Sequence, residues 1–326
     1  MLIKWISGLF GEQHGPKAIA VPAAGVALPA AAPERAPSRA LDTSFYRWLA
    51  QADARTPAPG TDTVMLDELD RLASAPGAGA HLVPRVPAIV PKLLRSLRDE
   101  NMSGADLTHI LSQDVVLVAE VIRAANSPYY RPANPIKTIE SAVMLLGQNG
   151  MRMIVARVAF RPVISSQAGS LARQAAPRVW RHAEKCALAA SLLAPRMGAH
   201  PFEAYLAGLM NNVGLIVALR LFDQLYPDPV LPKSDAFHEA LAGRARTLSA
   251  RIAASWDFPD TVTAAIALCG QPGAPALART LAQAERLASL RLLVDAGQLQ
   301  AAGPTVLAGL DEAMLACFDK LSIEED

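Results

Sequence analysis

The stretch AYLAGLMNNVGLIV, residues 204–217, places two adjacent amides, Asn211 and Asn212, in the middle of an apolar run. Its apolar residues fit the spacing of a buried helix. Flanking Gly208 and Gly214 predict that neighbouring helices approach closely there. Buried amide groups need hydrogen-bond partners, so the pair marks either a polar pocket or an ordinary polar patch inside a helical core.

The rest of the chain carries the same helical periodicity. Its 326 residues are 52% hydrophobic, enough for a substantial core. From about residue 82 onward no period-two alternation appears, which predicts an all-α fold. Several short helices are expected before residue 165, one of them capped by Thr138 and ended by Gly147. After Pro177 the expected helices are 177–197, 201–224, 235–255, 259–269, 275–295 and 304–319.

The first eighty residues differ from the rest in composition and hydrophobic pattern. Residues 1–14 form a short amphipathic segment with an apolar run of about ten residues, too short to span a bilayer but able to dock weakly on a membrane surface. Residues 15–40 are rich in Pro and Ala and predict a disordered linker. Residues 41–80 predict satellite helices whose aromatic residues, Phe45 among them, pack onto the main body. No transmembrane segment is expected.

Charge and cysteine content exclude some classes of protein. Lys and Arg number 31 against 30 Asp and Glu, so no global positive field attracts nucleic acid, and no nucleic-acid partner is expected. Cys186, Cys269 and Cys317 lack paired metal spacing and suit a reducing, cytoplasmic setting. No phosphate-binding glycine loop, G-x-S-x-G or H-E-x-x-H motif occurs, and no cofactor is expected.

Five segments in register carry a family resemblance: LVPRVPAIVPKLL, LSQDVVLVAEVIRAANSPYY, KTIESAVMLLGQNGMRMIV, VWRHAEKCALAASLLA and AYLAGLMNNVGLIV. From about Leu82 to Ala274 the chain resembles the HDOD domain, the HD-related output domain of bacterial signalling proteins. The resemblance implies an N-terminal helical subdomain over residues 81–165, an HD-like subdomain over 166–274, and C-terminal helices over 275–326 that pack on this core.

The same resemblance assigns a degenerate metal site. In HD phosphohydrolases a histidine on one helix and an adjacent His-Asp pair on the next hold a divalent metal that activates water. His182 matches the first histidine, Asn211 and Asn212 fall at the His-Asp pair, and Cys269 falls at a later His-His pair. Amides are neutral and bind transition metals weakly, so these four residues are expected to form a vestigial pocket without metal or catalysis.

The motif NSPYY, Asn126 to Tyr130, supports two interpretations. Asn at a helix end followed by Pro is typical of a structural turn. Alternatively, Asn126, Tyr129, Tyr130 and Arg131 form an interaction surface, because Tyr and Arg are enriched where proteins bind one another.

The resemblance implies a non-catalytic signal-transduction protein that acts through protein–protein interaction, in cyclic-di-GMP, motility or stress signalling. Its expected partners are other signalling proteins, such as a histidine kinase, a GGDEF protein or a receiver protein. Two alternatives stay open: a residual metal-dependent phosphohydrolase built around His182, and a sensor that binds a nucleotide in the vestigial pocket.

Overall fold

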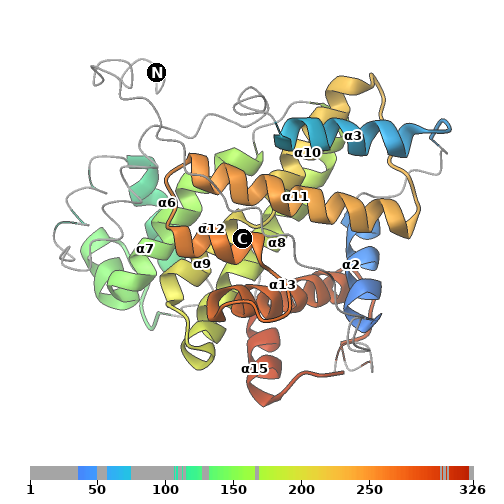
Figure 1. The fold of residues 1–326 in the computed structure, drawn as a ribbon. Coiled ribbons are helices and arrows are strands. Elements are labelled where there is room, and N and C mark those ends of the chain that lie inside the picture. The colour runs from blue at the N-terminus through green and yellow to red at the C-terminus, as the bar shows by residue number, and fades with distance from the viewer. Residues whose placement is uncertain are drawn as a thin grey trace.

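A computed structural model describes residues 36–49, 57–74, 115–126, 132–165, 169–301 and 308–322, with a few isolated positions between them. Within these ranges every regular element is a helix, which confirms the predicted all-α class (Figure 1). The amphipathic segment 1–14, the linker up to residue 35 and Tyr129 to Arg131 lie outside the described residues.

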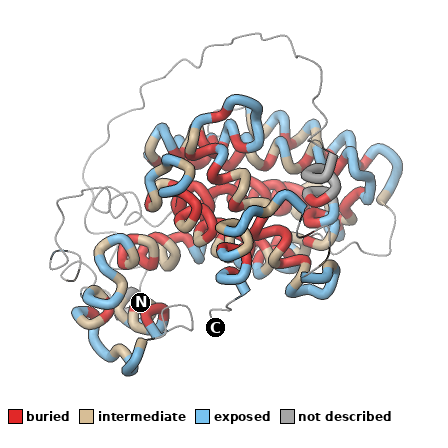
Figure 2. The backbone as a smooth tube through the Cα atoms, turned by 90° about the horizontal axis from the view of Figure 1, so that it is seen from below, coloured by how far each residue is buried: buried red, intermediate tan, exposed pale blue. Residues whose placement is uncertain are grey.

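One long helix, α8, organises the fold. It packs along α9 and α13, and α10 and α11 pack on each other beside it. Figure 2 shows the buried residues concentrated in these central helices, with exposed residues on the outer ones. In chain order the helices are α2 (Ala36–Leu49), α3 (Thr61–Ser74), α6 (Val115–Ala125), α7 (Ile139–Ser165), α8 (Ser170–Met197), α9 (Pro201–Met210), α10 (Val213–Leu225), α11 (Asp235–Ser255), α12 (Asp260–Ala267), α13 (Ala276–Asp295) and α15 (Glu312–Lys320).

The helix expected over residues 201–224 is two helices, so that prediction is wrong. The chain leaves helical geometry at Asn212, where φ is −104° and ψ is 8°. Ser249 of α11 stabilises the break, because its hydroxyl donates to the Asn211 carbonyl at 2.7 Å and accepts from the Gly214 amide at 2.8 Å. Backbone groups that the break removes from the helix ladder are thus paired by one side chain from a neighbouring helix.

This broken pair of helices is apolar because it is the core. Among the described residues, Pro201–Leu225 is the one stretch long and apolar enough to cross a membrane, and its most apolar window is 100% buried inside the fold. Core packing therefore accounts for its composition.

Gly208 and Gly214 allow the close approach predicted for them. A Cβ on Gly208 would lie 2.5 Å from the Ala187 Cα of α8. A Cβ on Gly214 would lie 2.0 Å from the Ala245 carbonyl oxygen of α11. Both distances are far below van der Waals contact with backbone atoms, so any side chain would force the helices apart.

Gly214→Ala is therefore expected to lower the free energy of unfolding by about 1–3 kcal/mol, the usual cost of overpacking a core. Gly243 provides a control, because it lies inside α11 and its Cβ would meet nothing within 4 Å. Gly243→Ala should stabilise the protein by about 0.5–1 kcal/mol through helix propensity. Urea unfolding of the two variants measures both effects, and equal values would contradict the packing role of Gly214.

The segment expected as linker and satellite helices belongs partly to the core. α2 begins at Ala36, so the linker predicted over residues 15–40 ends earlier than expected. Phe45 and Leu49 are each 2% exposed, as their predicted packing requires. Arg178 of α8 donates to the carbonyl of Leu49 at 2.9 Å and so caps the end of α2.

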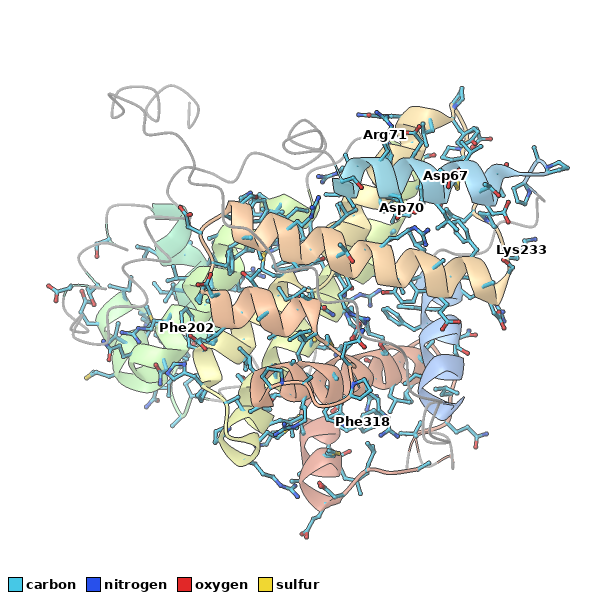
Figure 3. All side chains as sticks on the ribbon, viewed as in Figure 1. Asp67, Asp70, Arg71, Phe202, Lys233 and Phe318 are labelled. Carbon is cyan, nitrogen blue, oxygen red and sulfur yellow. The ribbon has the colours of Figure 1, made fainter. Side chains whose placement is uncertain are left out.

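α3 lies along α11 on the outside of the bundle (Figure 1). Its Met65 and Leu69 are fully buried. Asp70 faces α11 (Figure 3) and accepts two hydrogen bonds from Arg244, at 2.9 and 2.6 Å. A twin contact of this kind fixes the orientation of the helix as well as its position.

The remaining boundaries follow local signals. Thr138 caps α7, accepting from the Ser141 amide at 3.2 Å, and Gly147, with φ 64°, interrupts this helix where its end was predicted. The helix expected over residues 304–319 is interrupted, because residues 308–311 are not helical and α15 begins at Glu312, where Asp311 caps it by accepting from the Met314 amide at 2.9 Å. α15 then packs on α8 and α13 through the buried Phe318 (Figure 3).

Candidate functional site

His182 lies in the middle of α8 and is 1% exposed. Its Nε2 is 3.0 Å from the Ser289 hydroxyl of α13, and its Nδ1 is 2.5 Å from the Asn212 amide nitrogen. Because an amide NH2 can only donate, Nδ1 is the acceptor and the ring proton sits on Nε2, facing Ser289. Burial lowers the pKa of His182 to about 4, although Glu285 nearby opposes this effect. The ring is therefore neutral, with both nitrogens already paired.

The charged centre of the site is an ion pair between Arg246 of α11 and Glu285 of α13. The Arg246 Nη2 donates to both carboxylate oxygens, at 3.2 and 3.1 Å. The Cys269 thiol donates to the same carboxylate at 3.4 Å, and the Asn211 side chain hydrogen-bonds it as well. The Glu285 side chain is 15% exposed and that of Arg246 is 26% exposed.

Electrostatics keep this pair ionised. Burial by itself raises the pKa of the Glu285 carboxyl, but the charge of Arg246 and hydrogen bonds from Cys269 and Asn211 outweigh it, so the pKa lies below its usual range. Glu285 in turn raises the pKa of the Arg246 guanidinium. Both shifts favour the charged forms, as expected for opposite charges held in contact.

The structure brings together the four residues of the vestigial pocket. His182 contacts Asn212 directly, while Asn211 and Cys269 both contact Glu285. The sequence analysis did not identify Glu285 as a site residue, although its position in the sequence indicates that it is special. It stands on the buried face of α13, between Leu281 and Ser289 at intervals of four, where a charge requires a partner.

These residues do not fit a divalent metal. A metal site needs anionic ligands and free histidine nitrogens, whereas here the carboxylate is paired with a guanidinium and the His182 nitrogens face Ser289 and Asn212. Across the described ranges, no group of three or more His, Cys, Asp and Glu side chains could hold a metal ion. Arg246 supplies, beside the Glu285 carboxylate, the positive charge that a metal ion would supply in an HD-type metal site.

Asn126, the described member of the NSPYY motif, joins the end of α6 to Ile136, which lies shortly before α7. Its amide nitrogen donates to the Ile122 carbonyl at 2.9 Å and the Ile136 carbonyl at 2.8 Å. Its oxygen accepts from the Ile136 amide at 2.7 Å. Asn126 therefore has a structural role at the end of α6, while the other three residues of the predicted surface lie outside the described ranges.

Comparison with known proteins decides the family. The model of the HDOD domain matches residues 83–272, more than half of the chain. The chain belongs to the HDOD family. This confirms the resemblance that the five sequence segments indicate.

Solved structures share the HDOD fold. An HDOD domain protein of unknown function from Geobacter sulfurreducens has a TM-score of 0.54 at 21% identity, covering 81% of this chain and 94% of its own. A Shewanella amazonensis protein, provisionally named a metal-dependent phosphohydrolase, has a TM-score of 0.54 at 18% identity over 81% of this chain and 99% of its own. A Marinobacter aquaeolei protein, provisionally named for signal transduction, has a TM-score of 0.51 at 23% identity over 87% of this chain and 63% of its own.

A relative of uncharacterised function from Treponema pallidum is 21% identical over 239 residues. The match covers 68% of this HDOD chain and 44% of the relative, so the chain spans less than half of that protein's length.

Proposed function

We propose that this HDOD protein is a non-catalytic signalling module that acts by binding other proteins. The observation that carries the proposal is the Arg246–Glu285 ion pair. It stands beside Asn211, at a position where a hydrolase of this fold needs anionic metal ligands. A site without metal ligands has no means to activate water for phosphoester hydrolysis. Family membership, and the signalling name given to one protein of the same fold, agree with this role.

The test is metal analysis of the purified full chain together with phosphodiester turnover in added Mn²⁺ or Mg²⁺. We expect no stoichiometric metal, and turnover that does not differ between the wild type and His182→Ala. Stoichiometric metal with turnover abolished by His182→Ala would overturn the proposal and support the residual phosphohydrolase.

The partners we propose are signalling proteins such as histidine kinases, GGDEF proteins or receiver proteins, in cyclic-di-GMP, motility or stress pathways of a bacterial cytoplasm. An affinity pull-down should compare the full chain with one lacking residues 1–35. A longer truncation is a poor probe, because Phe45, Met65 and Leu69 are core residues. Specific capture of such a protein by the full chain supports the proposal, and its absence from both forms contradicts it.

A small-ligand sensor is the second candidate, and one atom favours it. The Asn211 side-chain oxygen is buried without a hydrogen-bond partner, beside the polar groups of Glu285 and Arg246. A polar ligand or water could donate to it. A thermal-shift screen of nucleotides, cyclic dinucleotides included, tests the idea, since a ligand at 100 times its dissociation constant stabilises the fold by about 2.7 kcal/mol. No shift with any nucleotide would reject it.

A further inference from the structure

Helix α2 covers the polar cluster around His182. The Phe45 ring packs against the His182 ring, with centroids 4.5 Å apart and planes tilted by 39°. The neighbouring Tyr46 is buried and lies close enough to Arg246 to raise its pKa. Figure 1 shows α2 crossing the ends of α11 and α13, the two helices that carry Arg246 and Glu285.

Beneath α2, the cluster is held by hydrogen bonds among the central elements. Ser289 and Asn212 hold His182, while Arg246 and Cys269 hold Glu285. Phe45 adds ring packing on top of these contacts. Removal of α2 would therefore expose a polar surface that is already formed, and the four hydrogen bonds of His182 and Glu285 would stay intact.

Residues at the edge of this surface contact the end and the side of helix α2. Arg178 caps a helix end through the Leu49 carbonyl at 2.9 Å, and its guanidinium lies 5.5 Å from the centre of the Trp48 ring. Asp235, at the start of α11, forms an ion pair with Arg47, and the two side chains are 71% and 49% exposed. The surface thus holds α2 through an aromatic ring, a basic side chain and a capped C-terminal carbonyl, which are features that a helix can present.

α2 depends on this surface for its own structure. It has 14 residues, a length at which an isolated helix is marginal in water. The sequence on each side, Pro- and Ala-rich before it and RTPAPGTDT after it, contains residues that disfavour continuation of the helix. Because α2 is marginal without this surface, we expect it to leave by unfolding locally, while the other helices stay folded.

We propose that the surface of α8, α11 and α13 beneath α2 is a helix-docking groove, which α2 occupies reversibly in competition with an amphipathic helix of a partner protein. The partner helix carries an aromatic side chain that packs on His182 and a basic one that pairs with Asp235. This inference rests on the proposed protein-binding function and assigns it a site. α2 then acts as the internal competitor that sets the partner's access.

The first test is native-state hydrogen exchange of the full wild-type chain, followed by mass spectrometry. We expect α2 amides to exchange about 100-fold or more faster than those of α8 and α13, through local opening. Exchange of α2 at the same rate as α8 and α13 would overturn the proposal, because α2 would then open only with the whole bundle. Binding of partners at other surfaces would be unaffected by that result, so the proposed function would stand.

The second test uses a labelled peptide of residues 36–50 as a stand-in for the partner helix. Phe45→Ala in the full chain should weaken the internal helix by about 100-fold or more, the cost of truncating a buried Phe. We therefore expect the peptide to bind this variant at least about ten-fold more tightly than the wild type, whose own α2 competes at high effective concentration. A Phe45→Ala peptide is the matched control and should not bind. Failure of the wild-type peptide to bind the variant, or equal binding by the control peptide, would overturn the proposal.

Discussion

Glu285→Leu is expected to lower the free energy of unfolding by about 3–5 kcal/mol. The substitution leaves the guanidinium of Arg246 largely buried without its counter-charge, and it removes the acceptor of the Cys269 thiol. The double variant Glu285→Leu/Arg246→Met should recover much of this loss, because well-packed apolar groups often replace a buried ion pair without cost. Urea unfolding of the wild type, both single variants and the double variant gives the coupling energy.

A neighbouring ion pair on the same helix gives the control. Arg244 of α11 also binds a carboxylate, Asp70, whose side chain is 54% exposed. Asp70→Ala should cost less than about 1 kcal/mol, as is usual for pairs near the surface. If Glu285→Leu costs no more than Asp70→Ala, the ion pair is not the buried centre that we describe.

Lowering the pH should destabilise the fold through His182. Burial lowers the pKa of this residue from 6.5 to about 4 in the folded protein. Between these values the unfolded chain binds a proton that the folded protein does not, so stability falls as the pH drops from 6.5 to about 4. The loss from this one residue is about 3 kcal/mol, and it is complete below the lower value.

Thermal or urea unfolding over this pH range measures the effect. His182→Gln should show a much shallower loss of stability. His238, also buried with a lowered pKa, provides the comparison, and His238→Gln should keep the part of the loss that belongs to His182. An unchanged pH dependence in His182→Gln would contradict the buried neutral state of this histidine.

Much of the fold could be predicted because helical periodicity and capping are local properties. Thr138, Gly147 and the glycines at 208 and 214 act where their patterns indicate. Features of the fold that depend on contacts between helices could not be predicted in this way. The helix over 201–224 looked continuous because its apolar spacing is unbroken, whereas the break depends on Ser249, which lies on another helix.

For the candidate site, the sequence by itself determined where the polar residues stand, and its resemblance to the HDOD family predicts that Asn211 and Asn212 fall at the His-Asp position, where neutral amides are poor metal ligands. Only the tertiary structure decided which groups meet there. Arg246, Glu285 and Phe45 come from three helices far apart in the chain, and they meet because those helices pack around His182. Contacts between residues so far apart follow no fixed spacing in the sequence. The ion pair and the helix that covers it can therefore be recognised only in the assembled bundle.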